Sequence, residues 1–77
     1  MPVKILLVDD DKGFREELRS YLEEYDCIEA SSGEEAIGIL KRPHEIDMAI
    51  LDVMMPGANG TEVLREMQRL DPGLGII

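Results

Sequence analysis

The sequence predicts an α/β fold in which a doubly wound parallel sheet is built from three β/α units and the start of a fourth strand. Three observations predict it. Short apolar runs alternate with longer amphipathic segments, turn residues such as glycine and proline separate them, and 77 residues with 44% apolar content suffice for one small domain. Strands that alternate with helices favour parallel pairing through right-handed crossovers.

The first strand and the first helix are predicted from apolar spacing. Residues 3–8 are β-branched and aliphatic apart from one lysine, which indicates a buried strand. Apolar residues three and four positions apart predict a helix over 12–24, with Asp11 as its N-cap. The stripe of this helix consists of Phe14, Leu18, Tyr21, Leu22 and Tyr25.

The second β/α unit carries a weaker strand signal and a clear helix start. Residues 27–31 are a short strand candidate. Ser32 and Glu35 have the spacing of a capping box, which predicts that a helix begins there. Pro43 is expected to end this second helix.

The third unit contains the most apolar window of the chain. Residues 46–55 predict a central strand that ends near Val53, and 55–60 are turn material. Thr61 is the expected N-cap of a third helix, whose apolar face consists of Val63, Leu64, Met67 and Leu70. Residues 74–77 resemble a fourth strand just beginning.

Charge and composition exclude several function classes. The chain has 17 acidic and 8 basic residues and a net charge of −9, so it would repel a phosphate backbone and no nucleic-acid partner is expected. The longest strictly apolar run has four residues, which is too short for a membrane span or a signal-peptide core. Cys27 is the single cysteine, which fits a reducing compartment, so we expect a cytoplasmic protein without a membrane partner.

Three aspartates follow two of the predicted strands. Asp9 and Asp10 come directly after the first strand, and Asp52 lies at the end of the third. Ligand sites of open parallel sheets form outside the carboxyl ends of the strands, so these carboxylates are expected to share one crevice. Two charges about 4 Å apart repel by roughly 4 kcal/mol at an effective dielectric near 20. Either one carboxyl keeps a proton or a hard cation binds, and so few carboxylates suit Mg²⁺ better than Ca²⁺.

Three separated segments resemble the receiver domain of bacterial two-component response regulators. They are Lys4–Asp11, Ala30–Ala36, and Asp47–Gly57 with Gly60, and the third carries the pattern D-x-x-M-P-x-x-x-G. The resemblance covers nearly the whole chain. It implies a flavodoxin-like fold with strand order 2-1-3-4-5, of which residues 1–77 would be the N-terminal part.

The resemblance also implies roles for particular residues. Asp52 matches the phospho-acceptor of a family that catalyses its own aspartyl phosphorylation. Asp9, Asp10 and Asp52 match the acids of the Mg²⁺ site, with Asp10 the more direct ligand, and Met54 matches the residue whose backbone carbonyl completes it. A histidine kinase or a phosphotransfer protein is the implied partner.

Two departures from the family limit this interpretation. Asn59 stands where the family often has aspartate. The chain also ends inside the fourth strand, without the hydroxyl residue and the lysine that hold the phosphoryl oxygens in the family, so phosphotransfer is expected to be impaired. Because an open sheet edge and an uncovered helix face would remain, the alternative is a non-phosphorylated module that forms a homodimer or a higher oligomer.

Other interpretations of the acidic residues are weaker. Asp9 and Asp10 as simple helix-capping residues would not require a third acid in the same crevice. A calcium loop fails because its glycine and its terminal glutamate fall at the wrong offsets. A haloacid-dehalogenase-like phosphohydrolase would need a second acid where this chain has Met54.

Overall fold

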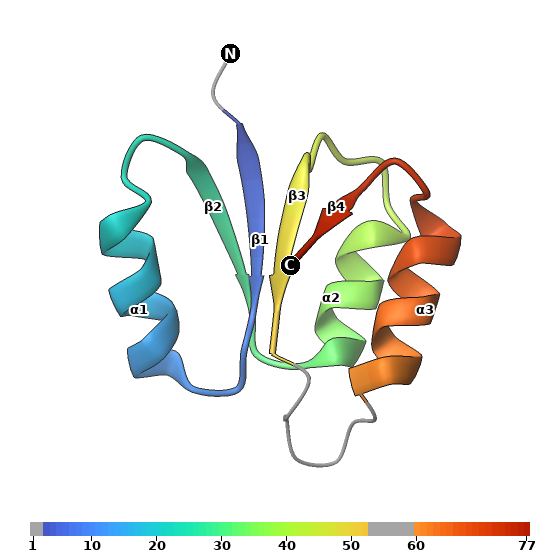
Figure 1. Ribbon diagram of the computed structural model, residues 1–77, viewed down its shortest axis with the longest axis horizontal. Coiled ribbons are helices and arrows are strands. Elements are labelled where there is room, and N and C mark those ends of the chain that lie inside the picture. The colour runs from blue at the N-terminus through green and yellow to red at the C-terminus, as the bar shows by residue number, and fades with distance from the viewer. Residues whose placement is uncertain (1–2, 53–59) are drawn as a thin grey trace.

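The computed structural model describes residues 3–52 and 60–77, which form a parallel sheet with helices on both faces (Figure 1). Within these residues the strands lie in the order β2-β1-β3-β4, which confirms the predicted flavodoxin-like α/β fold. The strands are β1 (Lys4–Val8), β2 (Asp26–Ala30), β3 (Met48–Leu51) and β4 (Gly75–Ile76). The helices are α1 (Lys12–Tyr21), α2 (Gly33–Leu40) and α3 (Gly60–Leu70).

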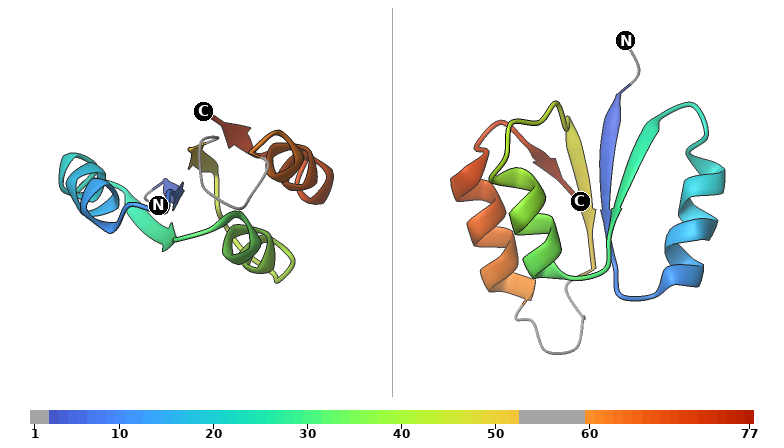
Figure 2. Two further views of the ribbon diagram at one scale, coloured as in Figure 1. Left: turned by 90° about the horizontal axis from the view of Figure 1, so that it is seen from below. Right: turned by 180° about the vertical axis from the view of Figure 1, so that it is seen from behind.

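The central strand β1 supplies side chains to two separate apolar clusters. Successive residues of a strand point to opposite faces of the sheet. Helices α2 and α3 lie on one face of the sheet and α1 on the other (Figure 2). Leu6 and Val8 pack with residues of α2 and α3, whereas Ile5 and Leu7 pack with Leu18 of α1. Burial on both faces explains why this strand reads as a continuous apolar run.

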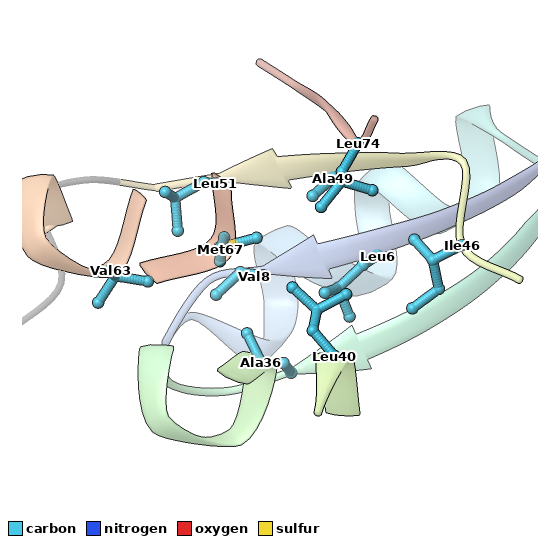
Figure 3. Packing of buried hydrophobic residues seen from close by; sticks show 11 residues of the cluster. Leu6, Val8, Ala36, Leu40, Ile46, Ala49, Leu51, Val63, Met67 and Leu74 are labelled. Atoms are coloured by element: carbon cyan, nitrogen blue, oxygen red, sulfur yellow. The ribbon is translucent and has the colours of Figure 1, made fainter. Parts of the chain in front are cut away.

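The larger cluster joins the sheet to α2 and α3. Met67 of α3 and Ala36 of α2 are fully buried in this cluster, as are Leu6 of β1 and Ala49 of β3 (Figure 3). The cluster consists of Leu6, Val8, Ala30, Ala36, Leu40, Ile46, Ala49, Leu51, Val63, Met67 and Leu74. The cluster packs β1 and β3 against α2 and α3, and this packing holds the two strands in place relative to each other.

Helix α1 is shorter and less buried than its sequence predicts. It ends at Tyr21 instead of residue 24, and Leu22 is its C-cap. Leu18 and Leu22 pack against the smaller cluster, but Phe14 is 45% exposed and Tyr21 77% exposed. The apolar stripe is therefore only partly a packing face, and the residues that pack lie in the C-terminal half of the helix and at its C-cap.

The other boundaries agree with the predictions to within a few residues. The weak candidate at 27–31 is the strand β2, and Cys27 in it is buried, which raises the pKa of its thiol. Ser32 caps α2 as predicted, since its Oγ accepts a hydrogen bond from the Glu35 N–H at 3.1 Å. The Glu35 carboxylate reaches back to Ser31 instead of Ser32.

The predicted N-cap of the third helix is wrong. Helix α3 begins at Gly60, so Thr61 lies in its first turn. Strand β3 spans Met48–Leu51, and Ile46 is buried just ahead of it as part of the larger cluster. Apolar content alone overestimates the strand because a buried approach segment is as apolar as the paired residues.

None of the helices within 3–52 and 60–77 combines the length and the apolar character that crossing a membrane requires.

Candidate functional site

The carboxyl ends of β1 and β3 lie side by side at one edge of the sheet (Figure 1). Val8 of β1 pairs with Leu51 of β3, so Asp9 and Asp52 are the residues that directly follow a paired position. The backbone holds both of them. The Asp52 N–H donates to the Val8 carbonyl at 3.0 Å, and the Asp9 N–H donates to the Ala30 carbonyl of β2 at 3.1 Å.

This register brings three carboxylates together. One carboxylate oxygen each of Asp9, Asp10 and Asp52 lies within 4.8 Å of the other two. Asp9 is 7% exposed, Asp52 is half-buried and Asp10 is exposed. The predicted convergence of these acids is confirmed, and it gathers formal negative charge at one end of the sheet.

Asp9 and Asp11 each hold part of the loop between β1 and α1 through a side-chain hydrogen bond. Asp9 Oδ1 accepts a hydrogen bond from the Asp11 N–H at 2.9 Å. Asp11 Oδ1 in turn accepts from the Phe14 N–H at 3.1 Å and caps α1, as predicted. Asp11 is therefore occupied at the helix, whereas Asp9 keeps lone pairs for a further ligand.

A cavity of about 370 Å³ adjoins the acidic group on the face where α1 lies. Asp9 and Asp52 line it together with side chains that are all apolar. These apolar lining residues are Leu7, Val8, Phe14, Leu18, Ile50 and Leu51. The carboxylates thus stand beside a low-dielectric wall, which strengthens the electrostatic interactions among them.

Arg15 is a residue of this region that sequence reasoning missed. It lies one turn after Asp11 on α1, and its Nη1 donates to the Asp9 carbonyl oxygen at 2.6 Å. Its Nε donates to Glu29 of β2 at 3.0 Å, and Arg19 Nη1 donates to the same carboxylate at 2.9 Å. Hydrogen bonds from Arg19 and Arg15 hold the pKa of Glu29 below its usual 4.5. The only sequence signal for this contact is the position of Arg15, four residues after the N-cap Asp11.

The remaining predicted site residue lies outside the described residues. Met54, assigned a backbone carbonyl ligand, falls in the segment 53–59, as does Asn59. The role of Met54 therefore stays a prediction.

The donor set that the structure does describe fits a hard divalent cation. All three side chains offer carboxylate oxygens. Such oxygens suit Mg²⁺, which binds through one or two carboxylates and keeps several waters. A cation at this position would also relieve the repulsion among the three charges.

Comparison with known proteins decides the family. The response regulator receiver domain family matches residues 5–77. The chain belongs to the receiver domain family of two-component signalling. Response regulator MprA of Mycolicibacterium vanbaalenii is 40% identical over 79 residues, which cover 100% of this chain and 34% of MprA. The receiver described here therefore spans about a third of the length of that relative.

Solved receiver structures have the same fold. A CheY-like receiver domain from Methanospirillum hungatei matches with a TM-score of 0.90 and 26% identity, over 99% of this chain and 62% of that one. The response regulator TrrA of Thermotoga maritima, crystallised with Mg²⁺ and BeF, matches with a TM-score of 0.85 and 36% identity. That match covers 96% of this receiver and 65% of TrrA. TrrA has also been crystallised in complex with the histidine kinase ThkA.

Proposed function

We propose that this receiver is a Mg²⁺-dependent phospho-acceptor and that Asp52 is the residue that takes the phosphoryl group. The observation that carries the proposal is the convergence of the Asp9, Asp10 and Asp52 oxygens within 4.8 Å at the carboxyl ends of β1 and β3. Residues 1–77 would then be the N-terminal part of a receiver domain.

In the proposed reaction Asp52 is the nucleophile. One of its carboxylate oxygens attacks the phosphorus of the donor, the bond from phosphorus to the donor's leaving group breaks, and an aspartyl phosphate forms. Asp10 and Asp52, with Asp9, would hold Mg²⁺, and the Met54 backbone carbonyl would complete the site. The cation would supply charge neutralisation for the phosphoryl oxygens. Asp52 follows β3 directly and is half-buried, and its N–H is bound to the Val8 carbonyl at 3.0 Å, so its backbone is held beside β1.

The donor in the cell would be a histidine kinase or a phosphotransfer protein. The crystallised complex of TrrA with ThkA supports the kinase, because TrrA matches 96% of this chain. A kinase partner and a lone cysteine that forms no disulfide support a cytoplasmic location.

The test is phosphorylation by a small donor. The protein is incubated with acetyl phosphate and Mg²⁺ and its intact mass is measured. We expect a phosphoryl adduct that Asp52→Asn abolishes and that Asp47→Asn leaves intact. Asp47 is the matched control because it lies at the opposite end of β3, where its carboxylate accepts a hydrogen bond from the Lys4 N–H at 3.0 Å. An adduct that survives Asp52→Asn would refute the assignment. Impaired phosphotransfer stays a prediction. The fraction of the protein that carries the adduct in the mass spectrum measures it, and a small fraction is the expected result.

A second candidate function is self-association, with a second copy of this chain as the partner. Apolar side chains that the described residues leave exposed favour it, namely Phe14 beside the cavity and Ile77 after β4, which is 74% exposed. Sedimentation at micromolar concentration would detect a dimer or a higher oligomer, and a compact monomer would exclude this candidate.

A further inference from the structure

Arg15 connects three parts of the fold next to the acidic group. Its guanidinium extends from α1, donates to the Asp9 carbonyl at the end of β1 and pairs with Glu29 on β2. The Arg15 side chain is only 11% exposed. An arginine buried to this degree is held in one geometry, because its planar fork is already oriented for two partners.

The bond to the Asp9 carbonyl acts on the backbone of the site. That carbonyl belongs to the peptide group that joins Asp9 to Asp10. The N–H on the other side of Asp9 is bound to the Ala30 carbonyl, so both backbone groups of Asp9 are fixed. A peptide group is planar, so fixing its carbonyl also fixes the plane from which Asp10 departs.

Asp10 needs this support more than its neighbours do. It is exposed, whereas Asp9 is buried and Asp52 is half-buried. No packing therefore limits where the Asp10 carboxylate goes, and its direction follows from the backbone that carries it. Arg15 holds the peptide group that precedes Asp10, and the hydrogen bond from the Asp11 N–H to Asp9 Oδ1 holds the one that follows it.

The charge of Arg15 is balanced by a carboxylate outside the acidic group. Glu29 receives hydrogen bonds from both Arg19 and Arg15, and these hold its pKa below 4.5, so it is ionised at neutral pH. Glu29 offsets only part of the charge of Arg15 and Arg19, and the residual positive charge would oppose cation binding, so what Arg15 can contribute to a cation site is geometry.

We propose that Arg15 is a positioning residue for the cation site: its bond to the Asp9 carbonyl sets the Asp9–Asp10 peptide and thereby aims the Asp10 carboxylate at the cation. The proposal rests on the proposed function, since it requires that the acidic group binds Mg²⁺. It predicts that removing Arg15 weakens Mg²⁺ binding, whereas a purely electrostatic role of Arg15 predicts the opposite change. Removing a cation from the neighbourhood of three carboxylates would by charge alone tighten Mg²⁺ binding, whereas loss of positioning weakens it.

The experiment compares Mg²⁺ affinity, measured by titration calorimetry, in the unaltered protein and in two variants. Arg15→Met keeps the length of the side chain but has no donor, and we expect it to weaken Mg²⁺ binding by about tenfold, the lower end of what loss of a group supporting a metal ligand costs. Arg19→Met is the matched control. It removes the other arginine of Glu29 without touching Asp9, and we expect its affinity to stay within about twofold of the unaltered protein.

Circular dichroism and urea unfolding establish that each variant is folded at the temperature of the titration. If Arg15→Met does not fold, Arg15→Lys replaces it, because lysine keeps the charge beside Glu29 but lacks the planar fork that reaches both acceptors. We expect Arg15→Lys also to weaken binding, by less than Arg15→Met. Unchanged or tighter binding in the folded Arg15 variant would overturn the proposal. If the unaltered protein itself produces no binding heat, the proposed cation site fails and the role of Arg15 fails with it.

Discussion

Gly33 is the position where the fold has no room for a side chain. A Cβ atom built on it would lie 2.5 Å from Cγ2 of Val63 and 3.1 Å from Cγ1. Gly33 opens α2 and Val63 lies on α3, so the two helices are in close contact at this pair. The missing side chain allows the helix pair to close over the larger cluster.

We therefore expect Gly33→Ala to lower the free energy of unfolding by about 1–3 kcal/mol, since an added methyl must push α2 and α3 apart. Gly38→Ala is the matched control on the same helix. Nothing lies within 4 Å of its Cβ position, so alanine there should raise the free energy of unfolding by about 0.5–1 kcal/mol through helix propensity. Urea unfolding of both variants measures this. Equal effects of the two substitutions would contradict the close approach.

For single residues, the sequence predicts the three aspartates of the site but not the residues whose contacts hold the surrounding structure in place. Asp9, Asp10 and Asp52 stand out because they interrupt or end apolar strands, and the rule for parallel sheets places them together. Arg15 and Gly33 carry no such mark. Their importance depends on which residues lie across from them, and that follows from the packing of α1 on β2 and of α2 on α3.

Among the elements, α1 is held by few contacts. It has no fully buried residue, and only Leu18 and the following Leu22 pack on the smaller cluster. The ion pairs of Glu29 with Arg15 and Arg19 add a second attachment between β2 and α1. Because the loop before α1 carries Asp9 and Asp10, this attachment matters for the site as well as for the helix.

The attachment should make stability depend on pH. The folded protein holds the pKa of Glu29 below its usual 4.5, so the stabilisation is fully present above about pH 4.5 and is lost as the pH falls through the lower, folded pKa. We expect Glu29→Gln to unfold at lower urea concentration than the unaltered protein at pH 7. The gap should narrow as the pH falls below 4.5. A gap of constant size between pH 7 and pH 3 would show that the charge of Glu29 contributes nothing.

The sequence predicts an element best where a cap residue and apolar spacing agree. Ser32 and Asp11 each mark a helix start that the structure confirms. Apolar spacing predicts too late an end for α1, because the spacing continues to Tyr25, which is exposed. Spacing identifies a face but does not reveal whether another element covers it, and that depends on tertiary structure.

The strand order of the whole sheet determines where Asp9, Asp10 and Asp52 lie. Chain segments that are 43 positions apart meet because β1 lies between β2 and β3 and all the described strands are parallel. The larger cluster behind β1 and β3 holds these strands in register, so Asp9 and Asp52 cannot separate without unpairing Val8 from Leu51. The fold thus gathers three carboxylates at one edge of the sheet, and a cation bound among them would offset their negative charge.

The most direct test of this account is urea unfolding with and without Mg²⁺ at constant ionic strength, for the unaltered protein and for Asp10→Asn and Asp52→Asn. Without Mg²⁺, both variants should be more stable than the unaltered protein, since each removes one of the repelling charges. At a hundredfold excess over its dissociation constant, Mg²⁺ should stabilise the unaltered protein by about 2.7 kcal/mol, and it should stabilise the variants much less. Variants that are no more stable than the unaltered protein, together with an unaltered protein that does not respond to Mg²⁺, would contradict the claim that the three carboxylates form one cation site.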